Sequence, residues 1–301
     1  MPTTGAYVER SLDGGSGSPG YGSAMLPLLA LLSSACWGTS DFFAGLKART
    51  IAPPAVVAVT QAFALVALSV ILLLRHEGLA ASFSGNGPFW AIAAGAAGAA
   101  GLVCFYTALA SGTMGVVAPI SSLGALVPVL LGLPTGEHPS ATAWAGMAIA
   151  VTGAALASGP ELAGAVPPRP VILAAAAAMF FGVALFSLDR GARYALLETL
   201  WGMRLTSVAM FLVAGLVARS VGGTRARDLP VLAVIGLGDV TANGLFAFAS
   251  SRGMVSVASV LGSLYPVATL FWARLLLGER LRRVQAIGVG LTLVGVVAIA
   301  V

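Results

Sequence analysis

Apolar runs about as long as a membrane-spanning helix follow one another along almost the whole sequence. We place ten of them, at residues 24–45, 52–74, 88–110, 114–133, 140–158, 170–189, 196–218, 229–251, 255–277 and 283–301. A helix needs about 20 apolar residues to cross a bilayer, and each run is near that length. Strands would alternate in polarity and would need a closed barrel. The sequence therefore predicts an all-α integral membrane protein with ten transmembrane helices.

The charge content agrees with a lipid environment and argues against nucleic acid as a partner. Charged residues make up only 9% of the chain, against about 25% in soluble domains. The net charge of +5 comes from single or paired cations in short connections, which form no continuous basic surface. Two cysteines and two histidines, all separated in sequence, predict no metal site and no cofactor. Residues 1–23 are rich in Gly, Ser, Thr and Pro and are expected to be a disordered polar tail.

The second half of the sequence repeats features of the first at a nearly constant offset. Near the starts of the halves, matching residues are 144 positions apart: Gly38, Phe42, Ala48 and Arg49 with Gly182, Phe186, Ala192 and Arg193. Farther on, the offset is 141: Phe105, Ala108, Gly112 and Ser122 with Phe246, Ala249, Gly253 and Ser263. Towards the ends it is 142: Gly136, Glu137, Gly146 and Gly153 with Gly278, Glu279, Gly288 and Gly295. The order of these matches indicates a duplication.

Each repeat contains five predicted helices, at 24–158 and 170–301. Because five is odd, the second copy must enter the membrane upside down. Inverted repeats are typical of secondary transporters, which hold substrate at the repeat interface near the bilayer midplane. We therefore expect two inverted five-helix repeats around a central path.

Four short motifs give the sequence a family resemblance. They are Cys36-Trp37-Gly38-Thr39-Ser40, the Tyr-x-Ala-Leu of 106–109, the Leu-Tyr-Pro of 264–266, and the LLLGERL of 275–281. Together they resemble the EamA-type members of the drug/metabolite transporter superfamily over residues 24–301. The resemblance implies ten helices, a central substrate path and alternating access, without naming a substrate. His138-Pro139 departs from the family pattern, in which Arg-Leu is usual, so that connection can differ in geometry.

Ionisable residues inside a membrane are expensive and mark functional positions by default. Asp239 lies near the middle of run 229–251, with Asn243 on the same helical face. Arg204 lies at a depth from which it could reach Asp239, and Gln61 is its approximate counterpart in the first repeat. We predict an Arg204–Asp239 ion pair. Asp239 is a candidate substrate contact or proton carrier, and a purely structural ion pair is the alternative.

Asp41 has two readings because it lies close to the predicted end of the first helix. Its carboxylate could reach the basic connection that contains Lys47 and Arg49, or it could line the cavity beside Trp37. Trp37, Tyr106, Phe246 and Tyr265 are candidates for an aromatic cavity wall able to contact a substrate amine; ordinary packing is the alternative for each. Pro266 removes a backbone hydrogen bond to residue 262, so a kink is expected beside Tyr265.

These features predict a secondary-active transporter in the cell (inner or plasma) membrane, with export of a small metabolite, amino acid or drug-like solute as the favoured direction. Proton coupling would need a titrating carboxyl, and Asp239 and Asp41 are the candidates. A passive channel or lipid translocator is the alternative. An intramembrane enzyme is disfavoured because no paired catalytic groups are evident. The expected partners are a small-molecule substrate and the lipid bilayer, with the chain as a monomer or homodimer.

Membrane orientation stays open. Ten Lys and Arg residues fall on the side of the connection at Lys47, and five on the opposite side. The positive-inside rule places the richer side in the cytoplasm. The family resemblance implies a cytoplasmic N-terminus, which is the reverse assignment.

Overall fold

The computed structural model describes residues 25–75, 85–112, 114–133, 140–157, 168–219, 222–278 and 283–300, which contain helices and no strand. The helices are α1 (Met25–Lys47), α2 (Pro53–Leu74), α3 (Gly87–Ser111), α4 (Met114–Ser122), η3 (Leu123–Ala125), α5 (Leu126–Gly132), α6 (Ala141–Ala157), α7 (Pro168–Ala192), α8 (Leu196–Ala218), η5 (Ala226–Asp228), α9 (Leu229–Arg252), α10 (Val255–Gly262), α11 (Tyr265–Leu277) and α12 (Arg283–Ala300). The predicted tail and residues 136–139 and 279–282 lie outside the described part.

Each predicted apolar run coincides with one helix or with a broken helix. Among the described residues, six helical segments are long and apolar enough to cross a membrane: 53–74, 87–111, 168–192, 196–217, 226–252 and 255–277. Two shorter apolar helices cover 117–131 and 141–153. The chain is therefore an all-helical membrane protein, and the count of ten spanning helices stays a prediction.

Two runs that we expected to cross as single helices are interrupted near their centres. Run 114–133 becomes α4, η3 and α5, and run 255–277 becomes α10 and α11. Proline explains both positions, because Pro128 and Pro266 lack the amide that would bond to the carbonyls of Gly124 and Gly262. The second break confirms the kink expected beside Tyr265. The first corrects the continuous helix predicted for 114–133.

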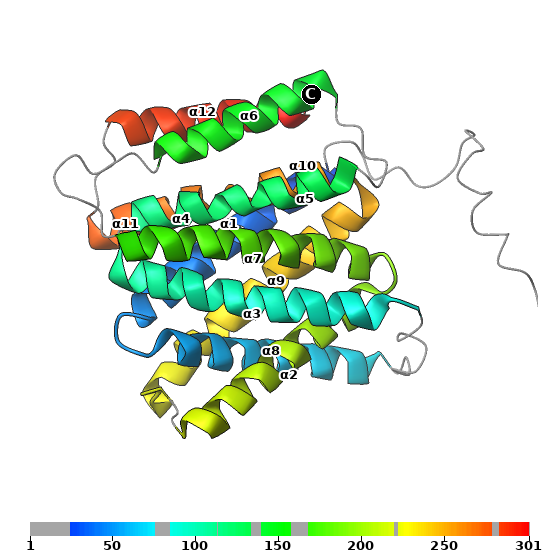
Figure 1. Cartoon of the computed structure of the whole chain (residues 1–301), viewed down its shortest axis with the longest axis vertical. Helices are drawn as coiled ribbons and strands as arrows, with labels where there is room; N and C mark the ends of the chain where they lie inside the picture. The colour runs from blue at the N-terminus through cyan, green and yellow to red at the C-terminus, as the bar shows by residue number, and fades with distance from the viewer. Residues whose placement is uncertain are drawn as a thin grey trace, which may run out of the picture.

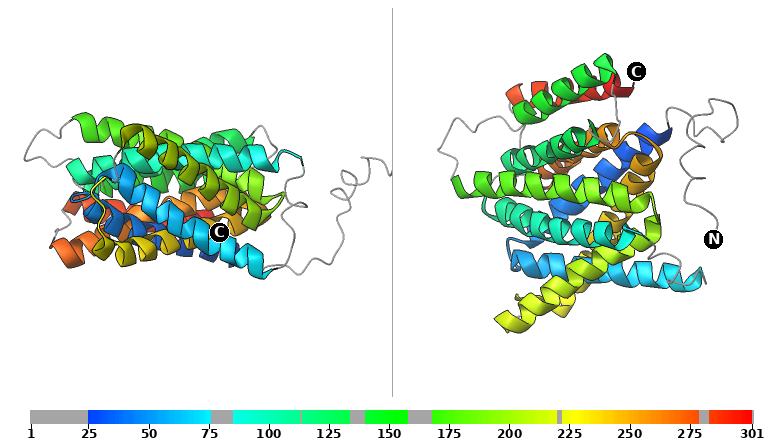
Figure 2. Two further views of the ribbon diagram at one scale, coloured as in Figure 1. Left: turned by 90° about the horizontal axis from the view of Figure 1, so that it is seen from below. Right: turned by 45° about the vertical axis from the view of Figure 1, so that its right-hand side comes forward.

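The helices form a bundle in which α6 and α12 lie side by side at one edge, while α2 and α8 lie at the other (Figures 1 and 2). The first repeat, α1 to α6, and the second, α7 to α12, alternate in space; α1 packs on α9 and α3 packs on α7. We call the end where α1 finishes the Lys47 end, and the opposite one the Met25 end.

Two glycines at equivalent positions let the two repeats approach closely. A Cβ atom at Gly38 of α1 would collide with the backbone carbonyl of Tyr265, at the start of α11. A Cβ atom at Gly182 of α7 would collide with the carbonyl of Gly124, in the η3 break. Gly182 follows Gly38 by 144 residues and Tyr265 follows Gly124 by 141, the two offsets found in the sequence. Each broken helix is therefore held against the first helix of the other repeat by the same contact.

The buried apolar core has two main clusters, stacked along the helix direction. The cluster at the Lys47 end includes Phe42, Phe105, Tyr106 and Tyr265. The cluster at the Met25 end is built from residues such as Leu188, Leu200, Phe246 and Leu261. Trp37 packs against both. The space between the clusters holds the charged side chains described next.

Candidate functional site

A cavity lies among the helices of both repeats. Its walls come from α1, α3, the two broken helices, α7, α8 and α9. Most of the lining is apolar, and the charged side chains that reach it are Asp41, Arg204 and Asp239. A largely apolar pocket with a few convergent polar groups is the usual form of a small-molecule site.

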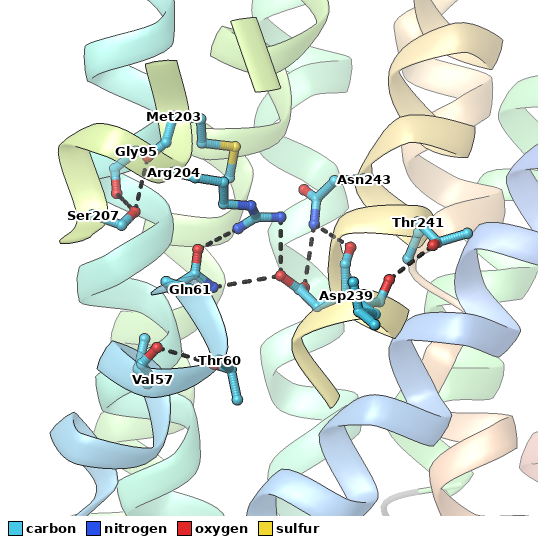
Figure 3. A network of polar contacts seen from close by, with 12 residues as sticks. Val57, Thr60, Gln61, Gly95, Met203, Arg204, Ser207, Asp239, Thr241 and Asn243 are labelled. Carbon is cyan, nitrogen blue, oxygen red and sulfur yellow. Dashed lines mark hydrogen bonds and ion pairs between the residues drawn. The ribbon is translucent and has the colours of Figure 1, made fainter. Parts of the chain in front are cut away.

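Arg204 and Asp239 form the predicted ion pair (Figure 3). Nη2 of Arg204 lies 2.9 Å from Oδ2 of Asp239, and only 1% of the arginine side chain is exposed. The two atoms lie within ion-pair distance, but the N–H bonds of Nη2 do not point at the carboxylate in the direction that a hydrogen bond requires. Among the described residues, Nε of Arg204 has no hydrogen-bond acceptor. The guanidinium thus keeps unused donor capacity inside the protein.

Neighbouring amides complete this network. Nη1 of Arg204 donates to Oε1 of Gln61, and Nε2 of Gln61 donates to Oδ2 of Asp239 at 3.4 Å. Nδ2 of Asn243 lies 3.2 Å from Oδ1 of Asp239 and also donates to the Asp239 carbonyl at 2.8 Å. The network is possible because Gly236 brings α9 against the backbone of Thr60 in α2, one residue before Gln61.

Asp41 is separate from this ion pair. Its carboxylate lines the cavity, is 6% exposed, and accepts a hydrogen bond from the Tyr106 hydroxyl at 3.1 Å. Lys47 instead binds Asp228, at 2.8 Å. The reading in which Asp41 meets the basic connection is therefore wrong, because α1 continues for six residues beyond Asp41, which carries the connection away from it. Among the described residues no cation is recorded within ion-pair distance of Asp41.

The structure places the four aromatic residues proposed for the cavity wall in two layers. Trp37 and Tyr265 line the cavity. Tyr106 lies behind Asp41, and Phe246 lies behind Trp37 with ring centroids 5.7 Å apart. The hydroxyl of Tyr265 donates to the Ala118 carbonyl at 3.1 Å, which joins α11 to α4. Tyr106 and Phe246 thus support the wall from a second layer, as Gln61 supports Arg204.

Most of the cavity wall consists of positions that are equivalent in the two repeats. The pairs, at the offsets found in the sequence, are Trp37 with Phe181, Asp41 with Leu185, Gly98 with Asp239, Leu102 with Asn243, Ser121 with Gly262, Ser122 with Ser263, and Gly124 with Tyr265. Gln61 and Arg204, approximate counterparts that are 143 residues apart, are joined by a hydrogen bond. Because both repeats contribute equivalent positions to its wall, the cavity lies at the interface between the repeats.

Several lining residues were missed from the sequence. Phe181 packs on Phe105 with ring centroids 5.5 Å apart, which repeats the Trp37–Phe246 contact. Its position 144 residues after Trp37 was a sufficient signal, but different aromatic residues occupy the two positions. Buried Asp189 was also missed; it pairs with Arg193 at 3.0 Å, outside the cavity lining.

Comparison with known proteins agrees with this architecture. The model of the EamA-like transporter family matches twice, at residues 25–159 and 168–301. The chain belongs to the EamA-like transporter family. The two matches also establish the duplication, since each covers one repeat of this EamA-like chain. Family membership makes it a membrane protein of a transporter family; it leaves the substrate, the coupling and the particular membrane unassigned.

Solved structures support the same fold. One, described only as "Crystal structure of protein", superposes with a TM-score of 0.73 at 18% sequence identity, over 91% of this chain and 96% of that chain. At that identity the likeness shows the fold alone. No curated protein matches the sequence.

Chemically, the site offers ion pairing and aromatic contact. Within the described residues there is no group of three or more His, Cys, Asp or Glu side chains placed to bind a metal. The broken helices expose Ser122 and Ser263 to the cavity, and Ser263 gives its hydroxyl hydrogen to the Val260 carbonyl at 2.7 Å. The arrangement is suited to holding a small solute with a polar group in an apolar surround.

Proposed function

We propose that this EamA-like protein is a secondary carrier that moves a small organic solute across the cell membrane by alternating access, with the central cavity as its binding site. The observation that carries the proposal is the position of the cavity between the two repeats, with both broken helices in its wall. Substrate sites between inverted repeats, formed by discontinuous helices, are characteristic of secondary transporters.

The packing around the cavity supports a mechanism with two exchangeable closures. Phe105, Phe181 and Tyr265 form a chain of ring contacts, with centroids 5.5 and 5.9 Å apart, in the apolar cluster at the Lys47 end. The Trp37–Phe246 contact is equivalent to the Phe181–Phe105 contact, and each joins one repeat to the other. Because the repeats are inverted, exchange of their conformations would exchange which end of the cavity is closed. Access would then pass from one face of the membrane to the other around a fixed site.

The proposed roles of the polar residues follow from their exposure to the cavity. Asp41, Arg204, Asp239 and Asn243 line it and would contact the solute, and of these the carboxyl groups of Asp41 and Asp239 could carry a coupled proton. Gln61 touches Arg204 and Asp239 from behind and would hold their orientation. Export is the direction we favour.

The carrier mechanism is tested by flux into proteoliposomes that contain the purified protein. Liposomes are loaded with a trial solute, and uptake of the same solute in labelled form is followed over a concentration series. The trial set comprises small amines, amino acids and sugars. A carrier gives saturable uptake that unlabelled solute on the far side accelerates, because each inward crossing is matched by an outward one. Uptake that rises linearly with concentration and shows no such acceleration would favour a passive channel instead.

A further inference from the structure

We propose that the cavity selects an organic cation, such as a protonated amine, whose charged group pairs with Asp41. The inference deepens the proposed function and rests on it for the assignment of the cavity as a transport site. In this proposal Arg204 and Asp239 neutralise each other, and the Asp41 carboxylate binds the charged group of the ligand.

The balance of charge in the cavity is the first argument. The ionisable groups that line the cavity and can carry charge near neutral pH are two carboxyl groups, Asp41 and Asp239, and one guanidinium, Arg204. The guanidinium lies 2.9 Å from the Asp239 carboxylate and balances its charge. With both carboxylates ionised, the site keeps one net negative charge, and a monovalent cation neutralises it. A bound anion would instead bring the total to two negative charges in a poorly solvated space, which is strongly unfavourable.

Among the described residues, no cation lies within ion-pair distance of the Asp41 carboxylate. From α3, the Tyr106 hydroxyl donates to the carboxylate at 3.1 Å. The other titratable groups that face this region are Asp239 of α9, Arg204 of α8 and Tyr265 of α11, which line the same cavity. Lys47, one and a half turns farther along α1, is held by Asp228 at 2.8 Å. A carboxylate buried to this degree is normally paired, so the partner is expected to come from the ligand.

Comparison of the two repeats shows that the fold itself does not need this charge. Leu185 occupies the position equivalent to Asp41 and lines the same cavity on α7. Gly38 and Gly182, each three residues earlier, make the same close approach to a broken helix. One scaffold position thus accepts leucine in one repeat and aspartate in the other. A buried charge is costly and the equivalent position holds leucine, so the aspartate is best explained by a functional role, and binding of a cation is the role we assign to it.

Trp37 supplies the second element of a cation site. It lies one helical turn before Asp41 on α1, on the same face, and both side chains line the cavity. The faces of aromatic rings attract ammonium groups, most strongly for tryptophan. Tyr265, opposite on α11, also lines this part of the wall. The carboxylate and the rings together match a ligand that carries an ammonium group on an apolar body.

The experiment compares three probes of nearly the same shape and different charge on the detergent-purified protein. They are 2-phenylethylamine, a cation at neutral pH, 2-phenylethanol, which is neutral, and 3-phenylpropionate, an anion. Dissociation constants are measured by isothermal titration calorimetry. We expect the amine to bind at least about tenfold more tightly than the alcohol, the factor equivalent to one charge-assisted contact. The anion should bind more weakly than the alcohol.

Variants identify the group responsible. Asp41→Asn should remove the tenfold preference for the amine over the alcohol, and Asp41→Glu should retain most of it. Asp41→Leu copies the residue of the other repeat, so it provides a second neutral variant if the amide fails to fold. Asp228→Asn is the matched control. It removes a carboxylate that pairs with Lys47 outside the cavity, so the preference should stay.

Several results would overturn the proposal. They are equal binding of the three probes, preference for the anion, no binding of the amine, and a preference that persists in folded Asp41→Asn or Asp41→Leu. The carrier proposal is judged separately by the flux assay. Saturable exchange of a neutral solute, without a cation preference, would leave the carrier intact and refute this inference. Binding of the amine through Asp41 without exchange would support this inference and refute the carrier.

Discussion

Removing the Arg204 guanidinium should destabilise the protein because it strands a buried carboxylate. The arginine side chain is 1% exposed and that of Asp239 is 8% exposed. Loss of one partner from a buried pair costs about 3–5 kcal/mol, since the remaining charge has no compensation. In Arg204→Gln, Asp239 would keep Gln61 at 3.4 Å and Asn243 at 3.2 Å. We therefore expect a cost near the lower limit, about 3 kcal/mol.

The double variant Arg204→Gln/Asp239→Asn contains neither charge and should recover most of this loss. Asp239→Asn alone should cost about as much as Arg204→Gln or more, because it leaves the guanidinium with Gln61 as its recorded neighbour. Two losses of about 3 kcal/mol would add to about 6 kcal/mol, and the double variant should cost no more than about 1–2 kcal/mol, so the coupling energy of the cycle should be about 4–5 kcal/mol. Such a cycle isolates the pair because the amide replacements keep similar size and polarity.

Thermal unfolding in detergent, followed by tryptophan fluorescence, measures the cycle; the chain has five tryptophans. A loss of about 3 kcal/mol corresponds to a decrease in Tm of roughly 6–12 °C for a protein of this order of size. Single variants that melt with the wild type, or effects that simply add in the double variant, would refute the view that the two groups form one buried unit.

Two further predictions concern the contacts that join the repeats. Gly38→Ala should lower the free energy of unfolding by about 1–3 kcal/mol, because the new methyl group meets the Tyr265 carbonyl. Gly290→Ala, which has open space around it, should be neutral or stabilising. Thermal unfolding of the two variants makes the comparison, and equal Tm values would contradict the prediction. Tyr265→Phe removes the hydroxyl that donates to the Ala118 carbonyl and should cost about 1 kcal/mol. A Tm of Tyr265→Phe equal to that of the wild type would contradict the hydrogen bond to Ala118.

The helices and the Arg204–Asp239 ion pair could be predicted from the sequence, because both depend on run lengths and on positions along the chain. The run lengths located the helices. The rise per residue of a helix was enough to place Arg204 and Asp239 at comparable depth, and the pair forms. The break at Tyr265 followed from Pro266 alone, since a missing amide acts locally.

Other features depend on tertiary contacts that no sequence pattern encoded. Asp41 looked like a helix-end residue, but α1 continues to Lys47 and α3 brings Tyr106 within hydrogen-bond distance of it. Phe246 was expected in the cavity wall, but Trp37 covers it. The positions of these side chains depend on which faces of the helices pack together, and that is known only from the folded bundle.

The central claim, that the cavity between the repeats opens alternately to the two faces of the membrane, is tested most directly by thiol accessibility. Cys36 and Cys104, both partly exposed, are first replaced by alanine. Ser263→Cys then places a single thiol in the cavity wall. Membrane-impermeant maleimide is applied to inside-out and right-side-out vesicles. The account predicts modification from both faces, with the ratio of the two rates changed by a transported solute. Modification from one face alone under every condition, or from neither, would contradict it.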